Sequence, residues 1–312
     1  MSVAASGWGA SVETVHRSDR PLLLAASLST LGRGRADPCH RVTADGALWR
    51  TSLMPTGPVS YRLVQQDATS VHCRAWGEGA VEFVDSLPDL LGECGAATDF
   101  APEHPKLIEA HRRLPGLRIP RTGRVFEALV PAILEQKVHG IAAHASWRRL
   151  VAAHGGVAPG PVPAGMRVPP PAPVWRRIPS WEYHRAGVDP KRSRAIVTAA
   201  AVADRLEQAV GMNPGDAEAR LRVVPGIGPW TAAEVAQRAL GDADALSVGD
   251  FHLAAVVGWS LLGRPLDDPG MVAYLEPLRP HRYRVIRLLE VSGQAVKPKF
   301  GPRTPVTDHR DR

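Results

Sequence analysis

The chain has 312 residues, with 38 basic and 31 acidic side chains, so its formal net charge is +7. A chain of this length folds into about one to three domains, and its longest apolar runs fall well short of the roughly 20 residues that span a bilayer, which excludes a membrane-spanning protein. Three widely spaced cysteines, Cys39, Cys73 and Cys94, exclude a disulfide framework, a CxxC zinc pattern and a four-thiolate iron–sulfur site. We therefore expect a protein of the reducing cytoplasm.

Most of the positive charge comes from arginine, since only five of the basic residues are lysine. Arginine binds phosphate through two parallel hydrogen bonds, so an arginine-rich surface suits a nucleic-acid partner. A GC-rich coding sequence would produce the same excess of arginine. Charge alone leaves both explanations open.

The first 100 residues predict a small domain of antiparallel strands behind a flexible leader. Residues 1–20 are small and polar, and we expect them to form that leader. Between residues 41 and 83, short apolar runs are separated by turn signals such as Asp45-Gly46. Polar and apolar residues alternate within these runs, as is typical of half-buried strands. We therefore expect an N-terminal α+β domain over residues 21–100.

Residues 101–293 predict an all-helical domain. Its clearest part is Val125–His154, where apolar residues recur every three or four positions. Seven of the sixteen residues at 158–173 are proline, which predicts an extended surface loop. We favour a plain linker there over a segment that binds a partner. Residues 294–312 are rich in proline, lysine and arginine, and we expect them to be a disordered basic tail.

A Pro-Gly-Ile-Gly turn between two predicted helices carries the first chemical signal. The first helix ends near Val224, and the second begins near Pro229, because proline is favoured at the first helical position. Pro225, Gly226, Ile227 and Gly228 lie between them, and Thr231 follows in the second helix. The glycines let the backbone approach a partner closely, and the amides of the second helix point at an anion such as phosphate. We expect Ile227 to fill the groove between the helices. A purely structural helical hairpin would explain the glycines equally well.

The second chemical signal is an acidic residue that follows this turn. Asp250 lies twenty residues beyond Trp230 and heads another predicted helix. An isolated aspartate in this position is most simply a helix N-cap. Its place after a helix–hairpin–helix favours a chemical role instead.

These segments resemble the helix–hairpin–helix (HhH-GPD) DNA glycosylase superfamily, which has a Gly/Pro-rich loop and an invariant aspartate. Within this superfamily, the sequence pattern is most similar to that of the 3-methyladenine DNA glycosylases of the bacterial AlkA type. The resemblance runs from Arg124 to about Gly293, and the strand-rich N-terminal region resembles the α+β domain of that type more loosely. It rests on the helix and Gln-containing turn at 126–138, the hairpin at 226–232, and the segment from 238 to Asp250.

The resemblance implies a base-excision mechanism. The target base is flipped out of the duplex while the hairpin binds the backbone beside it. Asp250 is implied as the catalytic carboxylate, which stabilises the positive charge that develops on the sugar. Bifunctional relatives carry a Schiff-base lysine where this chain has Trp230, so no β-lyase activity is expected. Trp230 could stack on an electron-poor alkylated base, or it could belong to the core. All three cysteines precede residue 100, which excludes the iron–sulfur branch of the superfamily.

Several positions depart from the AlkA-type pattern. Glu234 and Glu290 stand where that type has aromatic residues in its base pocket, and they could attract a cationic base or face solvent. Gln136 and Lys137 occupy the turn that supplies the wedge filling the gap left by the flipped base, and lysine replaces a common apolar residue there. Arg282 follows a Pro-x-Arg-like segment and could contact phosphate or cap a helix.

We therefore expect an α+β protein with a small N-terminal antiparallel-sheet domain followed by an all-helical HhH-GPD glycosylase domain. We interpret it as a monofunctional DNA glycosylase that acts on a damaged, alkylated purine in double-stranded DNA, as a monomer near the nucleoid. No cofactor or metal site is expected, although a monovalent cation could bind at the hairpin carbonyls. The alternatives are a non-catalytic DNA-binding protein, a glycosylase for another damaged base, and a scaffold that binds partners through residues 158–173.

Overall fold

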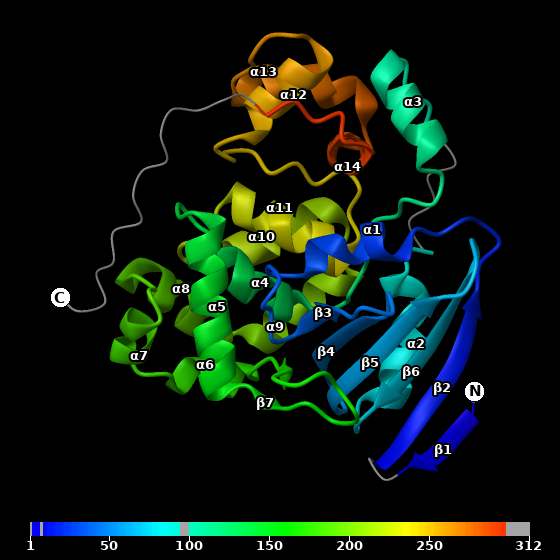
Figure 1. The fold of residues 1–312 in the computed structure, drawn as a ribbon. Coiled ribbons are helices and arrows are strands. Elements are labelled where there is room, and N and C mark those ends of the chain that lie inside the picture. Colours follow the sequence, from blue (N-terminus) through cyan, green and yellow to red (C-terminus); the bar gives the residue numbers. More distant parts are fainter. Residues whose placement is uncertain (1, 7–8, 94–99, 298–312) are drawn as a thin grey trace.

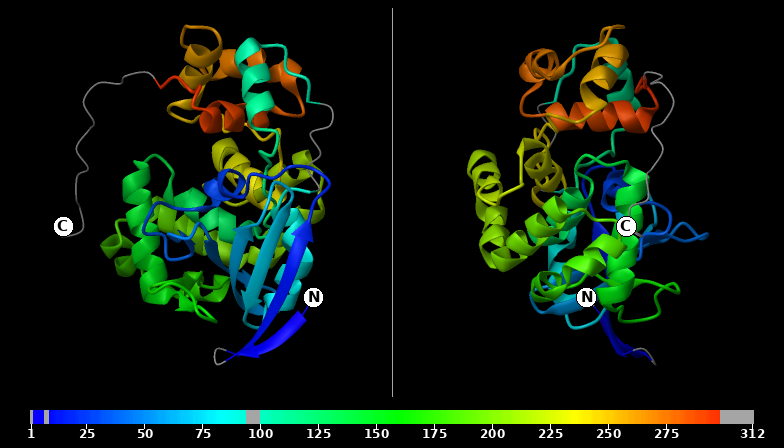
Figure 2. Two further views of the ribbon diagram at one scale, coloured as in Figure 1. Left: turned by 45° about the vertical axis from the view of Figure 1, so that its right-hand side comes forward. Right: turned by 90° about the vertical axis from the view of Figure 1, so that its left-hand side faces the viewer.

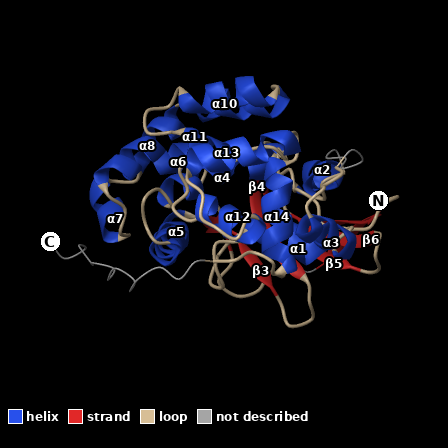
Figure 3. Ribbon diagram, turned by 90° about the horizontal axis from the view of Figure 1, so that it is seen from above, coloured by secondary structure: helices blue, strands red, loops and turns tan. Residues whose placement is uncertain are grey.

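The computed structural model describes residues 2–6, 9–93 and 100–297. Cys94 and residues 298–312 of the expected tail lie outside the described residues. A β-sheet with one covering helix lies beside a central helical lobe, and a second helical lobe lies above both (Figure 1). Seen from above, the strands and most of the central helices occupy opposite sides of the molecule (Figure 3). The predicted succession of an antiparallel sheet and a helical part is confirmed.

The main sheet of the described chain has six antiparallel strands in the order β1-β2-β6-β5-β4-β3. Its period-two alternation buries both faces, so that Leu48 and Ala75 face one core whereas their neighbours Trp49 and Trp76 face another. Helix α2 (Ala80–Leu90) covers the first face. The strands are β1 (Ser2–Ser6), β2 (Gly9–Arg17), β3 (His40–Val42), β4 (Leu48–Met54), β5 (Gly57–Gln65) and β6 (Ser70–Trp76).

The expected flexible leader is wrong for most of residues 1–20. Strand β2 pairs with β6 over the register from Ser11↔Trp76 to Arg17↔Ser70, and β1 pairs with β2. Val12 is buried in the sheet core. The strand is stable because it satisfies the backbone groups of β6, which would otherwise be an exposed sheet edge.

The Pro-rich segment 158–173 is packed, so the expectation of an extended linker on the surface is also wrong. Its short strand β8 (Arg167–Val168) pairs with β7 (Gly156–Val157). Ala158, Met166 and Val168 are buried against the tryptophans of the second sheet face. Thr51 donates its hydroxyl to the carbonyl of Arg167 at 2.5 Å. The segment therefore joins the helical part to the sheet.

The expected single helical domain over 101–293 divides into two lobes with separate cores in the described residues. Helix α3 (Pro105–Arg113) precedes the central lobe in the sequence yet packs against α14 (Arg282–Ser292) in the C-terminal lobe (Figure 2). The central lobe contains α4 (Val125–Leu134), α5 (Gly140–His154), α6 (Ala172–Arg177), α7 (Ser180–Arg185), α8 (Pro190–Ala201), α9 (Ala203–Glu207), η2 (Gln208–Gly211), α10 (Pro214–Arg222), α11 (Pro229–Val235) and the π-helical turn η3 (Ala236–Leu240). The C-terminal lobe contains α3 (Pro105–Arg113), α12 (Leu253–Leu261), α13 (Asp268–Leu275), η4 (Glu276–Leu278) and α14 (Arg282–Ser292). Among the described residues, no helix has the length and apolar character needed to cross a membrane.

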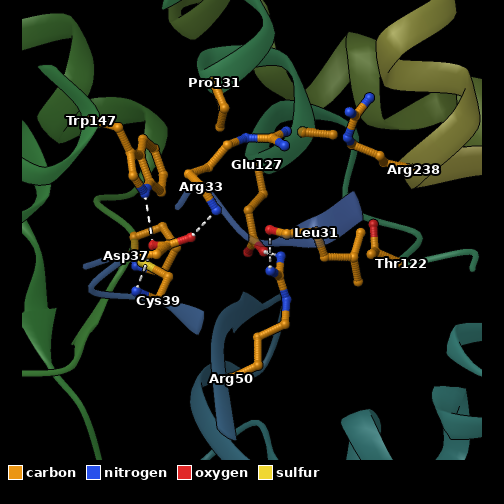
Figure 4. Close-up of a pocket in the computed structure, with 12 residues that line it drawn as sticks. Leu31, Arg33, Asp37, Cys39, Arg50, Thr122, Glu127, Pro131, Trp147 and Arg238 are labelled. Carbon is orange, nitrogen blue, oxygen red and sulfur yellow. Dashed lines mark hydrogen bonds and ion pairs between the residues drawn. The ribbon is translucent and has the colours of Figure 1, made fainter. Parts of the chain in front are cut away.

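A segment of the N-terminal domain lies against the central lobe. It contains α1 (Leu24–Leu28), η1 (Ser29–Leu31) and the loop that follows them. The Asp37 carboxylate is buried and accepts a hydrogen bond from Trp147 Nε1 of α5 at 2.9 Å. Asp37, Arg33 and Arg50 line a cavity together with Glu127 of α4 (Figure 4). The cavity has a volume of about 20 Å³, which is room for about one water molecule.

Arg33 from this loop also pairs with Glu135, the residue that follows α4. Its Nε lies 3.5 Å from Glu135 Oε1, and His144 Nε2 lies 3.5 Å from the same oxygen. Burial by itself would raise the pKa of Glu135, but the positive charge of Arg33 and the hydrogen bond from His144 outweigh it and lower this pKa from 4.5 to about 2. The carboxylate is therefore charged in the folded protein at every physiological pH.

This pair predicts how the stability depends on acid. Because the folded pKa of Glu135 is lower than the unfolded one, its contribution is complete above about pH 4.5 and is lost as the pH falls towards 2. It amounts to at most about 3 kcal/mol. In Glu135→Gln, the fall in Tm between about pH 6 and pH 3 should be smaller than in the wild type. Glu109→Gln removes an exposed ion pair with Arg112 and serves as the control. If Tm falls equally between these pH values in the wild type and both variants, the lowered pKa of Glu135 is contradicted.

Candidate active site

The predicted hairpin forms between α10 and α11, on the side of the central lobe nearest the C-terminal lobe (Figure 1). Gly226 has a φ of +91°, and a Cβ there would lie 3.2 Å from the Cβ of Ala195. Glycine therefore meets both a backbone and a packing requirement at this position. Ile227 is buried in the core of the central lobe, as predicted, while Pro225 and Gly226 are exposed. Gly228 is the residue before the first turn of α11.

Gln136 ties the hairpin to the turn between α4 and α5. Its Nε2 donates to the carbonyl of Gly226 at 2.9 Å and to Thr231 Oγ1 at 2.8 Å. Thr231 is only 2% exposed, so its hydroxyl faces this contact rather than solvent. The amide of Gln136 thus holds the hairpin in place, which is a role that the sequence did not indicate.

Lys137 is exposed at the tip of the same turn, directly after the tethered Gln136. Its φ of +54° is in the left-handed region, and no other non-glycine residue in the described part of the chain has a positive φ. Such a conformation is uncommon for a residue with a Cβ and often marks a functional position. The structure therefore presents Lys137 beside the hairpin, where the wedge was predicted.

The structure brings Asp250 and Trp230 together. Trp230 Nε1 donates to Asp250 Oδ2 at 3.3 Å, and both residues are half-buried. Asp250 Oδ1 accepts from the backbone amides of His252 and Leu253 at 2.8 and 2.9 Å. The carboxylate therefore caps the chain leading into α12 with one oxygen and faces the hairpin helix with the other. Oδ1 thus fits the N-cap interpretation, and Oδ2 fits the chemical one, so the two roles are compatible in one side chain.

Glu234 lies one turn after Trp230, but its carboxylate is already occupied. Oε1 accepts from Ser247 Oγ at 2.6 Å, and Oε2 accepts from Arg238 Nη1 at 2.7 Å. The Glu234 side chain is 13% exposed. This geometry favours a structural role over the expected place in the wall of a base pocket.

Glu290 is exposed on α14 and pairs with Arg287 at 2.7 Å. Tyr283 is buried on the same helix. Burial raises the pKa of the Tyr283 phenol, Arg238 and Arg287 lower it, and Glu234 and Glu290 raise it further. The charges of both glutamates therefore raise the pKa of one buried tyrosine, and Glu290 is the more exposed of the two.

Arg282 is buried at the start of α14, where the expected phosphate contact competes with an ion pair inside the protein. Its Nε and Nη2 donate to the two carboxylate oxygens of Asp244 at 2.9 and 2.8 Å. This two-point contact holds α14 to the loop after η3. The structure therefore favours the structural role of Arg282 that the sequence left open.

The sequence did not indicate that α14 buries several arginines. Arg282, Arg284 and Arg287 are each at most 9% exposed, although arginine is usually exposed to solvent. Arg287 Nη2 donates to the carbonyl of Ala26 and to Ser29 Oγ, both at 3.0 Å. These contacts join sequence-distant segments, so no local pattern could have found them. No group of three or more His, Cys, Asp or Glu side chains that could hold a metal occurs among the described residues.

Comparisons with known proteins agree with this arrangement. The chain matches no protein-family model. It is 31% identical over 212 residues to a probable bifunctional transcriptional activator/DNA repair enzyme AlkA of Mycobacterium tuberculosis, over 63% of this chain and 39% of that protein. The chain thus spans less than half the length of the curated relatives that it matches.

Solved structures share the fold over nearly the whole chain. A 3-methyladenine DNA glycosylase from Archaeoglobus fulgidus aligns with a TM-score of 0.74 and 17% identity, over 90% of this chain and 98% of that one. A Clostridium acetobutylicum 8-oxoguanine glycosylase/lyase, in complex with double-stranded DNA containing cytosine opposite 8-oxoguanine, aligns with a TM-score of 0.66 and 13% identity, over 90% and 98%. The predicted resemblance is therefore confirmed: this chain has the fold of the helix–hairpin–helix DNA glycosylases and is similar in sequence to a DNA repair enzyme AlkA.

Proposed function

We propose that this protein is a monofunctional DNA glycosylase of base excision repair, which hydrolyses the N-glycosidic bond of an alkylated purine in duplex DNA. The contact between Trp230 Nε1 and Asp250 Oδ2 carries the proposal. It places a carboxylate and an aromatic ring together at a hairpin suited to bind phosphate, within the fold of DNA glycosylases. The similarity to AlkA supports the repair of alkylated DNA.

The proposed reaction begins with extrusion of the damaged nucleotide. A base inside a duplex cannot be reached, so it is flipped towards Trp230. The exposed Pro225-Gly226 turn approaches the phosphate backbone, and the amides of the following helix face it. Lys137 stands beside the gap that the base leaves behind. These contacts position the nucleotide without reading the sequence around it.

Asp250 acts on the sugar once the base is flipped. As the glycosidic bond breaks, positive charge develops on the sugar ring, and an aspartate carboxylate at neutral pH stabilises that charge. Oδ2 accepts only the long 3.3 Å bond from Trp230 among the hydrogen bonds of the site, so its lone pairs remain available to the sugar and to the attacking water. The hydrogen bonds to Oδ1 fix the orientation of the carboxylate.

Trp230 defines the class of reaction and favours a class of substrate. Its indole has no nucleophilic amine, so no Schiff base forms and the product is an intact abasic site. The ring can stack on a flipped base, and an alkylated, positively charged base stacks best.

The proposed mechanism requires no cofactor. The Gly226 carbonyl already accepts from Gln136, so a monovalent cation at the hairpin would have to share that oxygen or use its neighbours. The hairpin and Asp250 come from the same chain, which supports action as a monomer. We infer from the proposed DNA substrate that the protein acts at the nucleoid.

The first test replaces the catalytic carboxylate. Asp250→Asn preserves the cap but removes the charge, and base release from methylated duplex DNA should fall by about 100-fold or more in single-turnover assays. The affinity for the same DNA should stay within about twofold. Asp267→Asn is the matched control, since Asp267 caps α13 through the amide of Gly270 at 2.8 Å. If wild-type protein binds damaged DNA but releases no base, a non-catalytic DNA-binding protein is the correct interpretation.

The second test concerns strand cleavage. Because Trp230 replaces the nucleophilic lysine, incubation with damaged DNA and borohydride should yield no covalent complex, and the strand should break only after alkali. Denaturing gels report both results. A borohydride-stable complex of the wild-type protein would overturn the monofunctional assignment.

A further inference from the structure

We propose that Glu234, Gln237 and Ser247, together with Arg238, are positioning residues that hold the Asp250 segment against α11. We call these four residues the polar clamp. The inference rests on the proposed glycosylase function for its catalytic consequence, but its geometry stands by itself. None of the four contacts Asp250 through a side chain in the structure, so they act through the backbone that carries it.

Ser247 is the centre of the polar clamp. Its hydroxyl donates to Glu234 Oε1 at 2.6 Å and accepts from Gln237 Nε2 at 2.8 Å. Gln237 Nε2 also donates to the carbonyl of Ala245 at 2.8 Å. Two side chains of the hairpin helix and its π-helical continuation therefore bind the segment 245–247 at two points.

The polar clamp is buried, so its hydrogen bonds are costly to lose. Ser247 is 5% exposed and Gln237 is 3% exposed. The side chains of Glu234 and Arg238 are each 13% exposed. A buried polar group that loses its partner cannot turn to water instead, and each such loss is destabilising. The segment consequently has one preferred position relative to α11.

The position of Ser247 determines that of Asp250. The backbone amide of Asp250 donates to the carbonyl of Ser247 at 3.2 Å, which closes a tight turn. Gly249 lies within this turn with a φ of +91° and no atom near its missing Cβ, so packing does not guide the chain there. The direction of the turn therefore depends on the residues before it, where the polar clamp holds Ser247 while Leu246 and Val248 pack on the core of the C-terminal lobe.

Helix α11 contacts both Asp250 and Ser247. Trp230 in the first turn of α11 contacts the Asp250 carboxylate, and Glu234, one turn later, contacts Ser247. The π-helical turn η3 follows with Gln237 and Arg238, and π-helical turns often occur at functional sites. Arg238 Nε also donates to the carbonyl of Thr30, which joins the polar clamp to the N-terminal domain.

A second triad of the same chemistry offers a matched control. Ser52 is 4% exposed and donates to Glu127 Oε2 at 2.6 Å, while Arg50 pairs with Glu127 at 2.7 Å. Ser247, Glu234 and Arg238 repeat this geometry, with distances of 2.6 and 2.7 Å. The Ser52 triad joins the sheet to α4. Its Arg50 and Glu127 line the same small cavity as Arg238 (Figure 4), but none of its hydrogen bonds reaches the segment 245–250. Ser52→Ala and Ser247→Ala therefore remove equivalent hydroxyls, only one of which belongs to the polar clamp.

The kinetic test compares these two variants in the full chain. Both should lower Tm by a similar few degrees, because both leave a buried carboxylate with one partner fewer. Only Ser247→Ala should lower the single-turnover rate of base release, by about 10- to 100-fold, with the Kd for damaged DNA within about twofold. Ser247→Thr retains the hydroxyl and should recover most of the rate. Equal rates in Ser247→Ala and Ser52→Ala would overturn the proposal.

A second measurement does not depend on activity. The indole N–H of Trp230 reports its contact with Asp250, and its resonance in a ¹⁵N-tryptophan spectrum can be assigned with Trp230→Phe. Ser247→Ala should shift this resonance and accelerate its hydrogen exchange, whereas Ser52→Ala should leave both unchanged. An unchanged resonance in Ser247→Ala would overturn the polar clamp. If the resonance moves but wild-type protein releases no base, the proposed function fails and the positioning of Asp250 stands.

Discussion

Buried arginines hold the parts of this protein together, because a guanidinium removed from water must find acceptors, and here the acceptors lie on distant segments. Arg238 from the central lobe and Arg287 from the C-terminal lobe both donate to the stretch 26–30 of the N-terminal domain. Arg33 in turn reaches from that domain to Glu135 after α4. The two lobes that carry the candidate site are thus fixed by a third segment that carries none of its chemistry.

This framework explains why the candidate site needs so few residues of its own. Gln136 ties the hairpin to the turn after α4, and Trp230 and Asp250 meet between the hairpin helix and the start of α12. Gln136 and Trp230 each donate a hydrogen bond to a partner that lies twenty or more residues away in the sequence. Rigid support of this kind keeps a carboxylate aligned with a developing charge, which is the main requirement of electrostatic catalysis.

Local signals in the sequence predicted the parts of the site that depend on local physics. A Pro-Gly-Ile-Gly turn predicts a hairpin because proline fixes its own φ and glycine adopts backbone conformations that other residues avoid. Ile227 is buried as expected. Local composition gave the wrong prediction for residues 1–20, because strand β2 is stabilised by pairing with β6. It failed again at residues 158–173, since the tryptophans that cover Met166 belong to the sheet.

The sequence by itself determined the hairpin and the position of Asp250 twenty residues beyond Trp230. Only the tertiary structure decided what the remaining polar residues do. Glu234 and Arg282 could have faced a substrate or DNA, but Ser247, Arg238 and Asp244 occupy them inside the protein. The physical reason is that a charged group binds whichever partner the fold brings within reach, and sequence spacing does not reveal that partner when it lies on another element.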